Sequence, residues 1–132
     1  MERRYLSPGL AKPPEPYAHG VQWGELVLIA GQVAFDEENN IVGRGDAAAQ
    51  ARQVWRNLAT VAESAGGTVR DIVKITVFLA DIRHAPHEIA VRSELFPADR
   101  FPICTQVQVA NLGLPELLME IDAIAIISGN QT

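Results

Sequence analysis

Hydrophobic residues at helical spacing mark residues 46–65 as a long amphipathic helix. Asp46 is a good N-terminal cap, and the Gly66-Gly67 pair is a common helix stop. The apolar stripe of this helix consists of Ala51, Val54, Trp55, Leu58, Val61, Ala62 and Ala65. Residues 86–96, which have a proline in their first turn, are predicted to form a second, shorter helix.

Alternation of apolar and polar residues predicts strands in the rest of the chain. We expect an edge strand at residues 3–6, a hairpin at 18–23 and 26–30, a small hairpin at 33–35 and 41–43, and a strand at 72–79. In residues 100–127 a Gly/Pro turn separates two further strands, which we interpret as one antiparallel hairpin. The last five residues, 128–132, are predicted to be a frayed tail.

The predicted hairpin of residues 100–127 contains the side chains that most suggest chemistry. Glu120 interrupts an apolar strand, and burying an ionised carboxylate without partners costs on the order of several kcal/mol. We therefore expect Glu120 to lie at a solvated sheet edge or in a pocket where it has a role. Cys104, the single cysteine of the chain, would lie directly across the hairpin from Glu120. The pair is the centre of the predicted site.

The order of elements predicts an α+β fold, with one mixed β-sheet and both helices packed on one face. A single domain over residues 1–132 fits this length. The opposite face of the sheet would carry polar side chains among apolar ones, which suggests burial against another copy of the chain. These polar residues are Cys104, Gln106, Gln108 and Glu120.

Composition narrows the class of function. A net charge of −5 makes nucleic acid a poor candidate partner. One cysteine rules out an intramolecular disulfide, and the apolar runs are too short to cross a membrane, so we expect a cytoplasmic protein. His84 and His87 have a spacing that can bind metal, but no third ligand is near them in the sequence, and we expect no metal site.

Six segments of the chain, in order, resemble the RidA/YjgF family. They are EPY, LIAGQV, AAQARQVWRNLATVAESAG, DIVKITVFLAD, FP..TQVQVA and MEIDAIAI. The resemblance implies a chorismate-mutase-like fold and a homotrimer with clefts between neighbouring subunits. It also implies hydrolysis of reactive enamines and imines, such as 2-aminoacrylate, to a keto acid and ammonia without a cofactor.

The resemblance also assigns roles to individual residues. Tyr17 matches the tyrosine after the Pro-rich loop, and Gly31 matches the glycine of the SGQ-type turn, with Ala30 where serine is common. Glu120 matches the glutamate that, together with the main-chain carbonyl at Gln106, would hold the attacking water.

Two positions differ from the family pattern. Cys104 replaces the arginine that binds the substrate carboxylate, and Ile89 replaces an asparagine of the second helix. Neither side chain can reproduce a bidentate arginine–carboxylate pair, whose loss costs about 2–5 kcal/mol. A pocket containing Cys104 and Ile89 therefore predicts an uncharged, more apolar substrate.

Four hypotheses remain open from the sequence. Glu120 could act as the general base of a hydrolase with altered specificity, or Cys104 could act as a nucleophile whose adduct is resolved by water held at Glu120. The third hypothesis is a non-catalytic trimer that binds a small molecule or has a regulatory role. The fourth is a pathway-specific enzyme that acts on an intermediate such as an aminomuconate-like enamine. In each of them the ligand is a small molecule rather than nucleic acid or a membrane.

Overall fold

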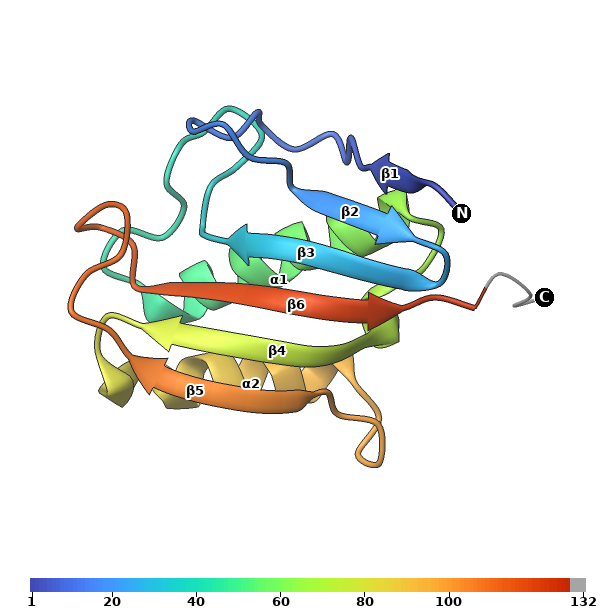
Figure 1. Cartoon of the computed structure of the whole chain (residues 1–132). Coiled ribbons are helices and arrows are strands. Elements are labelled where there is room, and N and C mark those ends of the chain that lie inside the picture. Colours follow the sequence, from blue (N-terminus) through green and yellow to red (C-terminus); the bar gives the residue numbers. More distant parts are fainter. Residues whose placement is uncertain (129–132) are drawn as a thin grey trace.

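The computed structural model describes residues 1–128, which form a six-stranded mixed sheet with two α-helices on one face (Figure 1). Residues 129–132 of the predicted tail lie outside the described residues. The spatial order of the strands is β1-β2-β3-β6-β4-β5. Their bounds are β1 (Arg3–Tyr5), β2 (Gly20–Trp23), β3 (Leu26–Gln32), β4 (Ile72–Leu79), β5 (Ile103–Gln108) and β6 (Met119–Ile126). The predicted α+β fold is confirmed.

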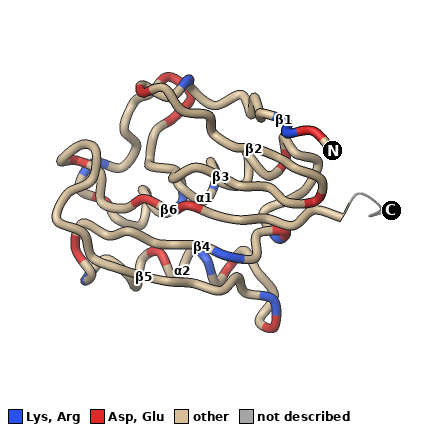
Figure 2. The backbone as a smooth tube through the Cα atoms, viewed as in Figure 1, with Lys and Arg blue, Asp and Glu red and all other residues tan. Residues whose placement is uncertain are grey.

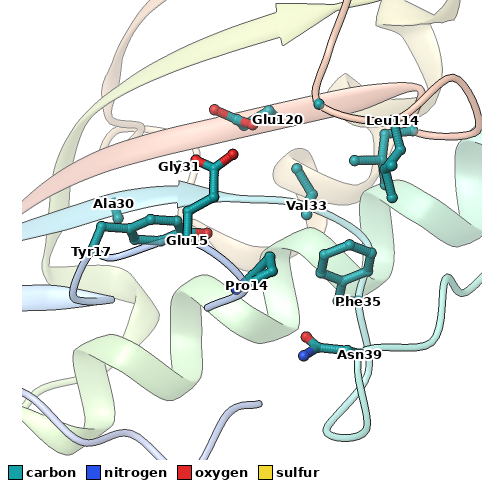
Figure 3. A pocket seen from close by; sticks show the side chains of 12 residues that line it. Pro14, Glu15, Tyr17, Ala30, Gly31, Val33, Phe35, Asn39, Leu114 and Glu120 are labelled. Atoms are coloured by element: carbon teal, nitrogen blue, oxygen red, sulfur yellow. The ribbon is translucent and has the colours of Figure 1, made fainter. Parts of the chain in front are cut away.

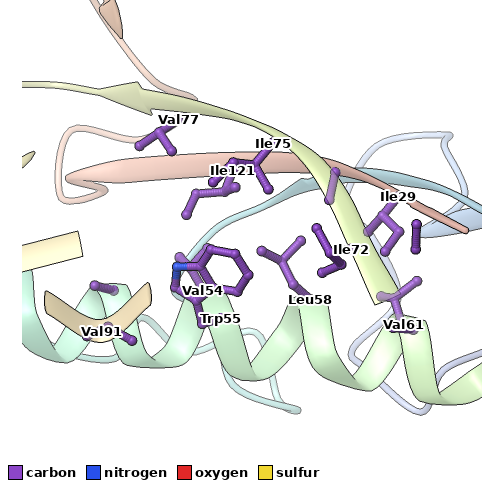
Figure 4. Close-up of a cluster of buried hydrophobic side chains, with 14 of the residues drawn as sticks. Ile29, Val54, Trp55, Leu58, Val61, Ile72, Ile75, Val77, Val91 and Ile121 are labelled. Atoms are coloured by element: carbon purple, nitrogen blue, oxygen red, sulfur yellow. The ribbon is translucent and has the colours of Figure 1, made fainter. Parts of the chain in front are cut away.

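The long helix α1 (Ala47–Ser64) lies where the apolar stripe placed it. The Asp46 carboxylate caps its first turn by accepting a hydrogen bond of 3.0 Å from the Ala49 amide. The buried face of α1 packs against apolar side chains of β3, β4 and β6 (Figure 4). The central side chains of this core are Val54, Trp55, Leu58, Val61, Ile72, Ile75 and Ile121. The small hairpin predicted at 33–43 is reduced to a single bridge between Phe35 and Ile41.

The second helix, α2 (Ala85–Leu95), packs against α1 through a buried polar cluster. Glu88 is completely buried and accepts a 2.9 Å hydrogen bond from the Trp55 indole N–H. Arg92, one turn further along α2, forms an ion pair of 2.7 Å with the same carboxylate. The buried charge of Glu88 is thus compensated by one cation and one neutral donor.

The predicted hairpin between residues 104–109 and 119–127 is wrong. β5 pairs in parallel with β4, and β6 lies between β3 and β4, antiparallel to both. The order β4, α2, β5 explains this arrangement, because a strand–helix–strand crossover joins parallel strands. Residues 109–118 then lead past the end of β4, where the Ala80 amide donates to the Leu118 carbonyl. The polar β5 becomes an edge strand and the apolar β6 a central one.

This register places Cys104 and Glu120 on opposite faces of the sheet. Cys104 is paired with Ile75, which is buried under the helices, whereas Glu120 is paired with Phe78 on the face without helices. Paired residues of neighbouring strands point to the same face, and successive residues alternate. The predicted polar set of the open face therefore loses Cys104, Gln106 and Gln108.

The open face of the sheet carries large, exposed apolar side chains. Among residues 1–128 no helix covers it (Figure 1). These side chains are Tyr5, Trp23, Leu28, Ile103, Val107 and Ile126. Burial of this face against another copy of the chain stays a prediction. Neither helix in the described part of the chain has the length and apolarity needed to cross a bilayer.

Candidate functional site

A cleft of about 660 Å³ opens where β3 ends and β6 begins (Figure 3). The Pro-rich loop before β2, the turn after β3, the loop of residues 109–118 and the start of β6 form its walls. The apolar part of the lining includes Pro14, Ala30, Val33, Phe35, Leu114 and Leu117. Its polar side chains are Glu15, Tyr17, Asn39 and Glu120.

Glycine at position 31 leaves the space that the Glu120 side chain occupies. The pairing of β3 with β6 shifts its register between Ile29 and Gln32, so β3 contains an irregularity at Ala30-Gly31. A β-carbon added to Gly31 would lie 2.8 Å from Cδ of Glu120, which is shorter than a real carbon contact. The absent side chain at 31 and the carboxylate at 120 therefore depend on each other.

His19 fixes the Pro-rich loop that carries Glu15 and Tyr17. Its Nε2 lies 2.8 Å from the Ala11 carbonyl oxygen, and its Nδ1 lies 3.2 Å from the Gln32 amide nitrogen. Because a carbonyl can only accept, Nε2 donates to Ala11 and Nδ1 accepts from Gln32. The imidazole also packs edge-on against the Tyr17 ring, with 6.3 Å between ring centroids. These contacts hold the loop against the end of β3.

The polar groups of the cleft are partly desolvated. Burial raises the pKa of the Glu120 carboxyl group, and the negative charge of Asp122 on the same face of β6 raises it further. Burial also raises the pKa of Tyr17, with additional contributions from the charges of Glu120 and Glu15. A carboxylate with increased basicity and a neutral phenol thus face an apolar space. This combination suits general base catalysis on a bound molecule.

Comparison with known proteins identifies the family to which this chain belongs. The chain matches the family model described as Endoribonuclease L-PSP over residues 10–127. A RutC family protein of Pyrococcus horikoshii is 34% identical over 125 residues, 95% of this chain and 98% of that protein. The structure of RidA from the Antarctic bacterium Psychrobacter sp. has a TM-score of 0.85 and 30% identity, covering 94% of this chain and 99% of that one. The chain belongs to the RidA/YjgF family.

A yeast protein also has this RidA/YjgF fold. The crystal structure of yeast YEO7 matches with a TM-score of 0.88 and 28% identity, over 96% of this chain and 100% of that chain. The two chains therefore share the fold over nearly the full length of both.

Three of the site residues predicted from the RidA/YjgF resemblance lie together in the cleft, and three do not. Tyr17, Gly31 and Glu120 line it, whereas Cys104 and Gln106 lie on β5, beyond β4. Neighbouring strands are about 4.8 Å apart, so the backbones of β5 and β6 are separated by about 10 Å. Within one chain Cys104 is therefore not opposite Glu120, and the Gln106 carbonyl cannot share a water with it.

Cys104 lies instead on the edge strand β5, near the charged side chains of Glu88 and Arg92 on α2. Ile89 is 44% exposed on that helix. Partial burial raises the pKa of the Cys104 thiol, and the positive charge of Arg92 opposes this only in part. Because the thiolate is the nucleophile, a raised pKa disfavours the hypothesis of covalent catalysis by Cys104.

Reasoning from the sequence missed Glu15 and the apolar wall of the cleft. The EPY segment pointed to Tyr17, but the glutamate two residues earlier also lines the cleft. A carboxylate inside a stiff Pro-rich loop is the signal that could have indicated it. Phe35, Leu114 and Leu117 come from loops far apart in the sequence, and only the fold brings them together.

We expect Gly31→Ala to reduce catalysis while leaving the protein folded. The new methyl group would displace the Glu120 carboxylate, and a shift of about 1 Å in a catalytic group can cost about a hundredfold in rate. The measurement is kcat for the imine hydrolysis proposed below, with circular dichroism to check folding. Gly113→Ala is the matched control, because Gly113 lines the same cleft and a β-carbon there meets nothing within 4 Å. Equal kcat values for the two variants would contradict this arrangement.

Proposed function

We propose that this RidA/YjgF chain is a cofactor-free hydrolase of C=N bonds that converts imines or enamines to carbonyl compounds and ammonia. The observation that carries the proposal is the half-buried Glu120 carboxylate, which faces an apolar cleft beside Gly31 and Tyr17. Its raised pKa makes it a stronger base than an ordinary glutamate, and the cleft can hold both a small electrophile and a water.

The chemical steps need only water. Glu120 removes a proton from water as the water oxygen bonds to the carbon of the protonated imine, and the π electrons of C=N move to the nitrogen, which gives a neutral carbinolamine. Glu120 then transfers its proton to the amine nitrogen of the carbinolamine. The C–N bond breaks and ammonia leaves as a lone pair of the hydroxyl oxygen forms C=O. Glu120 takes up the hydroxyl proton and passes it to the released ammonia, which leaves as ammonium. An enamine enters this sequence after protonation at carbon.

Cys104, Ile89 and Gln106 would reach such a cleft only from a second subunit. β5 is an edge strand with mostly exposed side chains, so it is free to approach a neighbouring copy. We propose a homotrimer with one site between each pair of subunits, in which Cys104 and Ile89 form an uncharged wall. The substrate would then lack the carboxylate that an arginine at this position would bind, and the specificity of this chain would be altered accordingly.

The proposal is tested with imines generated in the assay by an oxidase. An amino-acid oxidase supplies imines that carry a carboxylate, an amine oxidase supplies imines that lack it, and catalase removes the peroxide. Semicarbazide traps the remaining imine, so hydrolysis by the protein appears as less semicarbazone and faster ammonia release. We expect acceleration with the decarboxylated imine. No acceleration with either class would contradict the proposal and favour the non-catalytic binding trimer.

We expect Cys104→Ala to retain at least about half of the wild-type kcat. The Cys104 thiol has a raised pKa and lies on the opposite face of the sheet from Glu120 in its own chain, so it serves as a wall of the site rather than as a nucleophile. The same semicarbazone assay measures this, and iodoacetamide labelling confirms the loss of the thiol. A fall of about a hundredfold or more would restore the covalent hypothesis.

The name of the matching family model raises the alternative of an endoribonuclease. The electrostatics fit that activity poorly, since RNA binding relies on lysine and arginine contacts to phosphate. The chain carries a net charge of −5, and the side chains that line the cleft include two carboxylates and neither lysine nor arginine.

A further inference from the structure

Glu15 places a second carboxylate in the Glu120 cleft. It extends from the Pro-rich loop on one wall, whereas Glu120 extends from β6, and Figure 3 shows the Glu15 carboxyl group directed toward the side of the cleft that holds Glu120. The ion pairs among residues 1–128 join other residues, so neither carboxylate is neutralised by a salt bridge there. The cleft is both apolar and doubly acidic.

Tyr17 lies in the cleft with both carboxylates, and their charges raise the pKa of its phenol. The negative charges of Glu120 and Glu15 both disfavour ionisation of its phenol, so both carboxylates lie within electrostatic range of the hydroxyl group. The phenol can donate one hydrogen bond but brings no positive charge. Tyr17 therefore leaves the charge of the two glutamates uncompensated.

Basic residues around the cleft do not offset the negative charge of Glu15 and Glu120. The guanidinium of Arg44, in the loop between β3 and α1, is paired with Glu116 at 3.0 Å. The turn that carries Asn39, a lining residue, contains three acidic residues at positions 36–38, against one lysine, Lys12, in the Pro-rich loop. Figure 2 shows acidic residues along β6 and in the loops at this end of the sheet.

We propose that Glu15 is a specificity-determining residue that makes the cleft select cationic substrates. This inference rests on the proposed function and narrows its substrate class to protonated imines derived from amines, including those that carry a second ammonium group. Such an iminium ion has a net positive charge and gains attraction from both carboxylates. The iminium of an amino acid is zwitterionic, and its carboxylate would meet repulsion from Glu15 and Glu120.

The first test measures binding without turnover. Isothermal titration calorimetry compares 1,4-diaminobutane with butylamine and butan-1-ol, which share four carbons and carry two, one and no charges. We expect affinity to fall in that order in the wild-type protein. Glu15→Gln should weaken the binding of 1,4-diaminobutane by about fivefold, which is the upper range for the loss of an exposed ion pair. Glu37→Gln is the matched control, because it removes one charge from the nearby acidic turn without altering the lining.

The second test measures selectivity. Imines of 2-phenylethylamine and of L-phenylalanine share the phenyl group and differ by the carboxylate. We expect Glu15→Gln to shift the ratio of their kcat/KM values by about fivefold toward the carboxylated imine, and Glu37→Gln to leave it unchanged. Glu15 is exposed, so the variant should fold normally, which thermal melting checks.

The outcomes separate this inference from the proposed function. Equal binding of diamine and monoamine by the wild type, or equal losses in Glu15→Gln and Glu37→Gln, would overturn the role of Glu15 even where imine hydrolysis is found. Preferential diamine binding that depends on Glu15 would support the cationic cleft even where no imine is hydrolysed, and the proposed function alone would then fail.

Discussion

Glu120→Gln is expected to abolish the proposed imine hydrolysis while making the protein more stable at neutral pH. General base catalysis contributes about a hundredfold or more, so kcat should fall by at least that factor. The folded-state pKa of Glu120 is raised, which means that its ionised form is less favourable in the folded chain than in the unfolded chain. Removing that ionisation removes the penalty, and the melting temperature should rise. The measurements are kcat and thermal melting at fixed protein concentration.

The pH dependence of kcat and of stability provides a further test of this prediction. Wild-type kcat should decrease as the pH falls through the raised pKa of Glu120, because the base becomes protonated. The stabilisation in Glu120→Gln should be present above that pKa and disappear below the unfolded-state pKa, where the carboxyl group is protonated in both states. Glu63→Gln, an exposed position on α1, is the control and should change neither property. Two results would contradict the assignment of Glu120 as the general base. One is a Glu120→Gln variant that is less stable than the wild type, and the other is a variant whose kcat still decreases at low pH as in the wild type.

Glu88→Ala is expected to cost about 3–5 kcal/mol of unfolding free energy, the usual consequence of breaking a buried ion pair from one side. The substitution leaves the largely buried Arg92 without its carboxylate and the Trp55 indole N–H without its acceptor. Urea denaturation at constant protein concentration measures the change. Oligomer stability depends on concentration, so wild type and variant must be compared at the same value.

Two further variants define the origin of this loss. Glu94→Ala removes an exposed carboxylate from the same helix and should change stability by less than about 0.5 kcal/mol. Replacing both partners, Glu88→Leu with Arg92→Met, should recover part of the loss because no unpaired charge remains. If the single and double variants are equally unstable, packing of α2 rather than the charge pair explains the effect.

Local signals in the sequence were sufficient for both helices, for most strands and for the faces of most of them, although the hairpin predicted at residues 33–43 is only a single bridge. The Asp46 cap and the apolar stripe located α1 closely, and the alternation in β6 identified Glu120 as the polar residue of a mostly apolar strand. The irregularity of β3 between Ile29 and Gln32 coincides with Gly31, and glycine in a strand often marks a bulge. These features depend on neighbouring residues, so a single stretch of sequence contains the information.

Pairing between strands was the part that local patterns did not determine. A period of two shows that residues 104–109 form a strand, but not which strand lies beside it. Two signals in the sequence favoured the observed order: a helix between residues 79 and 103 predicts a parallel crossover, and the glutamines of β5 suit an edge strand. The apparent proximity of Cys104 and Glu120 came from their positions in the chain and not from the sheet.

The sequence by itself determined the family, the two helices and most of the strands, and it drew attention to Tyr17, Gly31 and Glu120. Only the tertiary structure decided which of the predicted residues share a cleft, because β4 inserts between β5 and β6 and separates Cys104 from Glu120. It also brought Glu15 and the apolar loop residues to the same cleft. Residues that meet through long-range strand pairing and loop packing are distant in the chain, and no local pattern encodes their contact.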